Sequence, residues 1–154
     1  MNKNELRINN IVGRKYTNPN PKGATTEIEA CFVKAIKEES VNISLSLKDK
    51  AILSKVRYAS IEPIPLTEKW LNKLEFEKNT EYKFNSYQLH PYWAQNGVIL
   101  FYNTGQEEYA YLCGYAEQRM GKYYAVGARW IKSVHELQNL YFALTGVELQ
   151  LSST

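Results

Sequence analysis

The sequence lacks the segments that carry a protein into or across a membrane. Residues 1–7 (MNKNELR) are polar and charged, with neither the apolar stretch of a signal peptide nor a transit-peptide pattern. No apolar run approaches the roughly 18 residues that a membrane-spanning helix needs. We therefore expect a cytoplasmic protein with no membrane contact.

The chain also lacks the short motifs that mark common catalytic sites. It contains no G-x-S-x-G, no G-x-x-x-x-G-K-[ST] and no G-x-G-x-x-G. Its 2 cysteines, Cys31 and Cys113, have no C-x-x-C spacing, and both lie in apolar runs typical of strands. We expect buried free thiols, no cofactor and no enzymatic activity.

Histidine is equally scarce, because only His90 and His135 are present. His135-Glu136 begins like a zinc-protease helix, but the second histidine of that motif is missing. A zinc site needs three or four converging ligands. We expect no metal site, with His135 a first-turn side chain and His90 a loop residue.

Aromatic residues, by contrast, are abundant, with 12 Tyr, 5 Phe and 3 Trp. They suit half-buried strands, and they also suit contact surfaces. The net charge of +3 is too small to indicate nucleic-acid binding, but residues 1–60 hold 11 Lys/Arg against 6 Asp/Glu. This basic first part could meet an acidic partner or phosphates, or form an ordinary surface of mixed charge.

The first third of the sequence predicts short strands joined by polar turns. Asn9-Asn10 indicates a turn or bulge, because Asn tolerates positive φ, and residues 17–23 (TNPNPKG) indicate a loop. Alternating apolar residues predict strands at 6–8, 11–12, 26–36, 41–47 and 51–61. This spacing favours an SH3-like small β-barrel over residues 1–62, with other meanders still open.

Residues 63–154 predict an α+β region, either a separate domain or part of one compact unit with the barrel. Pro63 and Pro65 favour an extended linker, and Thr67 is a candidate N-cap for a helix over 68–76 with a Leu66–Leu71 staple. An antiparallel meander follows, with strands at 98–102, 107–115 and 123–131. Gly114 and Gly127 there indicate bulges or close packing of a ring.

The chain closes with an amphipathic helix over 133–145 that we expect to pack on the sheet. Ser133 and Glu136 have the spacing of a capping box, and Gly146 is a stop signal. Apolar residues recur at helical spacing, namely Val134, Leu137, Leu140, Tyr141 and Leu144.

Three segments, in this order, resemble a set of small uncharacterised proteins of phages and prophages of Bacteroidota. They are residues 6–12 (LRINNIV), 61–71 (IEPIPLTEKWL) and 134–146 (VHELQNLYFALTG). Those proteins usually have Gly where this chain has Asn9, which supports a positive-φ turn. The resemblance covers about a third of the chain and implies a mobile-element setting, with no activity attached.

Two sets of residues are candidates for binding. The first is an aromatic set in a segment that Pro91 makes partly loop: Tyr87, His90, Tyr92 and Trp93. Its alternative is that Trp93 fills the edge of the core. The second is a basic set on the proposed barrel that could bind single strands by stacking and charge: Arg14, Lys15, Tyr16 and Lys34.

Asn139 lies between apolar positions of the last helix and could form a hydrogen bond to a neighbouring strand or to a partner chain, with the structural role favoured.

The leading functional hypothesis is a non-enzymatic accessory protein, phage- or prophage-encoded, that contacts an unknown protein partner. The alternative is a nucleic-acid-binding module that uses the basic barrel. The sequence gives no oligomeric state.

Overall fold

A computed structural model describes residues 1, 3–18, 25–45, 54–79, 83–84, 88–89, 92–102, 111–119 and 122–152. The chain forms two units: unit 1 comprises Met1–Ile64 and Ser133–Asn139, and unit 2 comprises Pro65–Lys132 and Leu140–Thr154. The predicted α+β class is confirmed. The expected division after residue 62 lies close to the junction at Ile64, but the first unit also takes in Ser133–Asn139.

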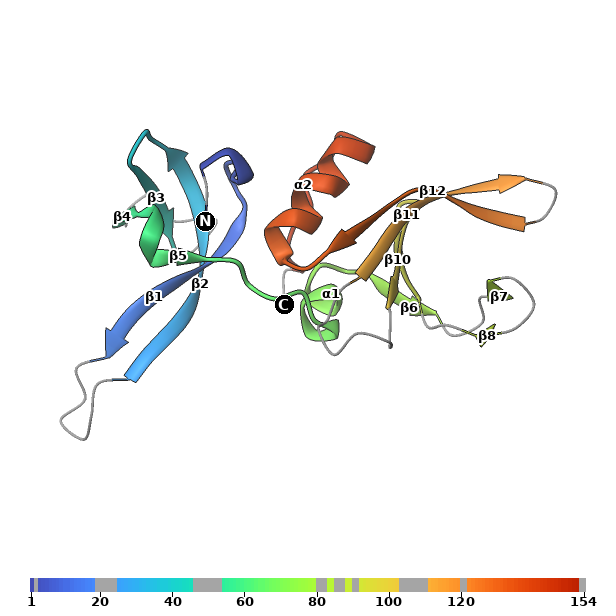
Figure 1. The fold of residues 1–154 in the computed structure, drawn as a ribbon, viewed down its shortest axis with the longest axis horizontal. Coiled ribbons are helices and arrows are strands. Elements are labelled where there is room, and N and C mark those ends of the chain that lie inside the picture. The colour runs from blue at the N-terminus through green and yellow to red at the C-terminus, as the bar shows by residue number, and fades with distance from the viewer. Residues whose placement is uncertain are drawn as a thin grey trace. The chain divides into compact units, whose positions relative to one another are not determined.

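Unit 1 is a curled antiparallel sheet that follows the short 3-10 turn η1 (Lys3–Glu5) (Figure 1). Its strands are β1 (Ile11–Asn18), β2 (Thr25–Ile36), β3 (Ser40–Ser44), β4 (Ser54–Arg57) and β5 (Ile61–Glu62), in the order β4-β3-β2-β1-β5. The last strand thus returns to the first, pairing with Gly13 and Arg14. The curl encloses a core of Leu6, Val12, Cys31, Val33, Val41, Ile43 and Ile61.

Several strand limits in unit 1 differ from those predicted. The predicted strand at 6–8 is wrong, because a turn closes there through the bond from Asn10 N–H to the Arg7 carbonyl. Thr17 and Asn18 belong to β1, although a loop was predicted. The strand predicted at 41–47 ends at Ser44, and Leu45 is exposed.

The predicted continuous strand at 51–61 is also wrong. The 3-10 turn η2 (Tyr58–Ser60) separates β4 from β5. The interruption has a topological cause, because β4 pairs with β3 while β5 pairs with β1. The chain must therefore leave one edge of the curled sheet and reach the other within three residues.

Unit 2 contains a second antiparallel sheet of five strands, in the order β12-β11-β10-β9-β6. The strands are β6 (Glu77–Asn79), β9 (Tyr92–Gln95), β10 (Val98–Tyr102), β11 (Tyr111–Arg119) and β12 (Lys122–Ile131). β7 (Lys83–Phe84) and β8 (Gln88–Leu89) form a separate pair. The predicted bulge is confirmed, since the β11–β12 register shifts around Gly114, opposite Gly127 and Ala128.

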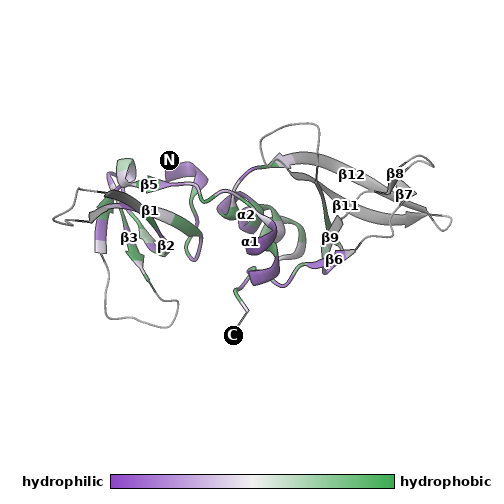
Figure 2. Ribbon diagram, turned by 90° about the horizontal axis from the view of Figure 1, so that it is seen from below, coloured by the Kyte–Doolittle hydropathy of each residue, from purple (hydrophilic) through white to green (hydrophobic). Residues whose placement is uncertain are grey.

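Helix α1 (Glu68–Lys73) begins as predicted, because the Thr67 side chain accepts a hydrogen bond from Trp70 N–H. It ends three residues earlier than the predicted Phe76, since Glu75 adopts φ +62°. Phe76 N–H then donates to the Leu71 carbonyl, and Glu75 N–H to the Asn72 carbonyl. This is a Schellman motif with Glu in place of the usual Gly. Figure 2 shows the helix as mostly hydrophilic, and Leu71 is its buried residue.

Helix α2 (Val134–Thr145) confirms the predicted closing helix. Ser133 N–H donates to Glu136 Oε2 at 3.2 Å, the glutamate half of a capping box. Gly146, at φ +72°, donates its N–H to the Phe142 carbonyl at 2.8 Å, which satisfies an end carbonyl. Val134, Leu137 and Tyr141 are buried as expected, whereas Leu144 is exposed. No helix in the described part of the chain is long and apolar enough to cross a membrane.

Candidate functional site

The structure describes two of the four residues in the predicted aromatic set. Tyr92 and Trp93 lie on β9 rather than in a loop, and their backbones pair with β10 on one side and β6 on the other. Tyr87 and His90 lie outside the described residues. The two described aromatics therefore belong to an inner strand of the sheet, and the set remains a prediction.

An Asn-Gly turn, which was not among the elements expected from the sequence, joins β9 to β10. Asn96 (φ +47°) and Gly97 (φ +80°) form a two-residue turn between the paired residues Gln95 and Val98. Positive φ at both positions is the type I′ geometry for which Asn-Gly is the strongest hairpin signal. Asn96 Nδ2 also donates to Tyr141 Oη at 2.6 Å, which ties the turn to the second half of α2.

The predicted basic set is divided between two faces of the β1–β2 hairpin. Arg14 and Tyr16 alternate with Lys15 along β1, so Lys15 points to the opposite face. Lys15 forms an ion pair with Glu62, and Arg14 lies directly opposite Glu29 on β2. The Nζ atom of Lys34 lies 5.9 Å from the centre of the Phe32 ring. Carboxylates thus face two of the four residues.

His135 is buried in the first turn of α2, with Nδ1 3.0 Å from Ser133 Oγ. Burial lowers its pKa below the ordinary 6.5, although the charges of Glu136 and Glu5 oppose this shift. Among the described residues, no group of three or more His, Cys, Asp or Glu side chains could hold a metal ion. His135 is thus a buried first-turn side chain that contacts Ser133.

Cys31 is a buried free thiol, as predicted. Burial is the main reason that its pKa rises to about 11, and the charge of Glu29 adds to the effect. A thiol with so high a pKa is a poor nucleophile near neutral pH. The Cys113 side chain lies outside the described residues.

Side-chain amides in the first half of α2 bond to residues just before and at the start of β1, and we call the residues whose side-chain amides take part the amide cluster: Asn10, Gln138 and Asn139. Gln138 Oε1 accepts from Ile11 N–H at 2.7 Å, and its Nε2 donates to the Asn9 carbonyl at 3.3 Å. Asn139 accepts from Asn10 Nδ2 at 3.0 Å and donates to the Glu5 carbonyl at 2.8 Å. The structural role expected for Asn139 is confirmed, and that of Gln138 was missed.

Asn9 occupies a position that favours glycine. Its φ is +70°, and the bond from Asn10 N–H to the Arg7 carbonyl makes it the third residue of a type II turn. Asn9 N–H donates to the Val33 carbonyl, and Val33 N–H donates to the Asn10 carbonyl. Asn9 and Asn10 together thus oppose the single residue Val33, which is a β-bulge. The first residue of this kind of bulge, here Asn9, is usually Gly.

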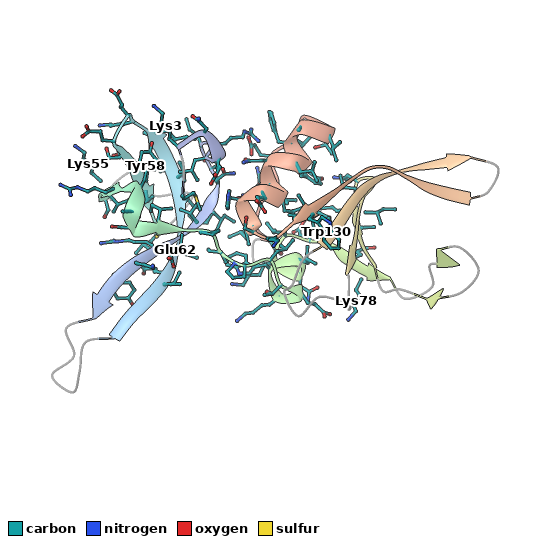
Figure 3. The ribbon with its side chains drawn as sticks, viewed as in Figure 1. Lys3, Lys55, Tyr58, Glu62, Lys78 and Trp130 are labelled. Atoms are coloured by element: carbon teal, nitrogen blue, oxygen red, sulfur yellow. The ribbon has the colours of Figure 1, made fainter. Side chains whose placement is uncertain are left out.

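Unit 2 exposes large apolar side chains near the end of β12, on the second half of α2 and just beyond that helix. Trp130, which is labelled in Figure 3, is 41% exposed, Leu144 41% and Val147 57%. Trp is over-represented at protein contacts, and contiguous exposed apolar patches mark interaction sites. No protein-family model, curated protein or solved structure matches this chain.

Proposed function

We propose that this protein is a non-enzymatic accessory protein, encoded by a phage or prophage, that acts in the cytoplasm by contact with another protein. The observation that carries the proposal is the exposure of Trp130, Leu144 and Val147 within unit 2. Trp is among the residues that most often dominate the binding energy of a protein contact. The resemblance of residues 134–146 to phage proteins supports the setting.

The test is affinity capture from host cells with the full chain as bait. Trp130→Ser/Leu144→Ser removes two exposed apolar groups from unit 2, and Ile28→Ser/Leu45→Ser removes two from unit 1 as a matched control. We expect wild type and control to recover the same partner, and the first variant to recover at least fivefold less. Failure to recover a reproducible partner, or equal recovery by both variants, would contradict the proposal.

We also propose that unit 1 is an SH3-like barrel. Its support is the return of β5 to β1 after a 3-10 turn, which brings the last strand to the first as barrel closure requires.

Nucleic-acid binding by unit 1 is the second candidate function. The excess of 11 Lys/Arg over 6 Asp/Glu in residues 1–60 favours it. A salt-dependent shift with single-stranded DNA or RNA is its test, and no binding at 50 mM salt would contradict it. Neutralising Arg14, Lys15 and Lys34 together tests whether the predicted basic set contributes.

A further inference from the structure

The turn between β9 and β10 holds the only Asn-Gly sequence in the chain, Asn96-Gly97. Asparagine is a chemically labile residue, and a following glycine makes it most prone to deamidation. The reason is steric, because glycine has no side chain to hinder attack by its backbone nitrogen on the asparagine side chain. Both residues are exposed, so water reaches the turn. The rate of the reaction therefore depends on how the fold holds this asparagine.

Two features of the fold keep the Asn96 side chain away from the Gly97 nitrogen. In type I′ geometry the ψ angle of the first turn residue is about +30°, which places the next nitrogen almost opposite Cβ. Ring closure needs that nitrogen on the same side as Cβ, so the turn must first open. The second feature is the hydrogen bond from Asn96 Nδ2 to Tyr141 Oη at 2.6 Å, which holds the side-chain amide in place.

Tyr141 is a fixed anchor for this amide. Its side chain is 2% exposed, and its ring meets the Phe76 ring edge-on, with 6.2 Å between the ring centres. Asn96 and Tyr141 both belong to unit 2, so the bond between them lies within one unit. A buried ring does not follow the turn into solvent, and opening of the turn must break this bond. The Tyr141 hydroxyl thus stabilises the closed turn against local opening.

We propose that Asn96 is a site of spontaneous deamidation and that Tyr141 is the positioning residue that slows the reaction. In the opened turn, the Gly97 backbone nitrogen gives its proton to water and attacks Asn96 Cγ. The new C–N bond closes a succinimide ring, and Nδ2 takes up a proton from solvent and leaves as ammonia. Water then adds to one of the two ring carbonyls and opens the ring, which yields aspartate or isoaspartate.

The two products differ in their effect on the turn. Aspartate keeps the main chain unchanged, and its carboxylate can accept a hydrogen bond from the Tyr141 hydroxyl, which reverses the direction of the bond. Isoaspartate carries Cβ in the main chain, so the connection between the paired residues Gln95 and Val98 gains a carbon atom. A longer connection no longer fits the type I′ turn. Isoaspartate should therefore release the end of the β9–β10 hairpin from α2.

The experiment incubates the full chain at neutral pH and follows Asn96 by peptide mass mapping, which separates asparagine, aspartate and isoaspartate. Wild type is compared with Tyr141→Phe, which keeps the buried ring and loses the hydroxyl. The control is Leu71→Ala, which destabilises unit 2 at a buried residue of α1. We expect Tyr141→Phe to convert Asn96 about fivefold faster than wild type, and Leu71→Ala to stay within about twofold of wild type while it remains folded.

Three results would overturn the proposal, and they are distinguishable. Conversion of Asn96 in the urea-unfolded chain but not in the folded protein would refute the modification site. Equal rates in wild type and Tyr141→Phe would refute the role of the hydroxyl alone. Equal acceleration by Leu71→Ala would show that general loss of stability, rather than the bond to Tyr141, controls the reaction.

Discussion

Gln138 pairs with Ile11 as a neighbouring β-strand would. Its Oε1 accepts from Ile11 N–H at 2.7 Å while its Nε2 donates to the Asn9 carbonyl, two residues earlier. An amide that accepts at one residue and donates two positions away reproduces the bonds of a strand peptide. One side chain of α2 thus satisfies buried backbone groups at the start of β1.

We expect Gln138→Leu to lower the free energy of unfolding by about 1–3 kcal/mol, because it leaves the buried Ile11 N–H without a partner. Gln138→Glu should destabilise the fold as well, because it places a carboxyl group in a buried position with one oxygen against the Asn9 carbonyl. Denaturant unfolding measures both, with the exposed Gln150→Leu as control. A Gln138→Leu protein as stable as that control would refute the role.

At Asn9, the conformation rather than the side chain decides stability. With φ at +70°, Asn9→Gly should match wild type within about 0.5 kcal/mol, whereas Asn9→Ala should cost about 1 kcal/mol. The same unfolding experiment compares them. Equal stability of the Gly and Ala variants would mean that the turn does not require a left-handed residue.

The two helix ends should respond with opposite signs. Glu75→Gly relieves a left-handed glutamate at φ +62° and should raise the free energy of unfolding by about 1 kcal/mol. Gly146→Ala should lower it by a similar amount, since a Cβ there meets nothing within 4 Å and only the backbone conformation opposes it.

The control for this pair is Lys69→Gly inside α1, which should be destabilising by about 1 kcal/mol. Thermal unfolding ranks the three variants. Destabilisation by Glu75→Gly would show that the glutamate side chain outweighs its backbone strain.

His135 should make stability fall in acid. Burial lowers its folded-state pKa below the 6.5 of the unfolded chain, so the unfolded state binds more protons once the pH drops below about 6.5. Above that pH neither state is protonated and His135 adds no slope. We expect urea midpoints to decline from pH 6.5 to 5.5.

His135→Asn should flatten this decline, because an amide can still face Ser133 Oγ without titrating. His90→Asn, which removes the other histidine, should keep it. An unchanged slope in the His135 variant would assign the pH dependence to carboxylates instead.

Local signals explain which parts of the fold the sequence predicts. Thr67, Ser133 and Gly146 act within one helical turn of their own positions, so the helix starts and the second helix end follow from the sequence. The early end of α1 does not, because Glu75 takes a conformation for which its residue type gives no signal.

Contacts between residues far apart in the sequence determine the remaining parts of the fold. The return of β5 to β1 and the bonds of Gln138 join residues far apart in the chain, and no local pattern encodes them. The Asn96-Gly97 turn is different, since its signal is local and identifies β9. For the candidate sites, composition identified basic and aromatic residues, but only the sheet register shows which face each basic residue occupies.

Residues 133–139 complete unit 1 through the amide cluster, and a double-mutant cycle between Asn10 and Asn139 tests this role most directly. Asn10 Nδ2 donates to Asn139 Oδ1 at 3.0 Å across 129 positions of sequence. We predict a coupling energy of at least about 0.5 kcal/mol between Asn10→Ala and Asn139→Ala. The pair Asn10→Ala and Asn72→Ala should be additive, and additivity of the first pair as well would contradict this role.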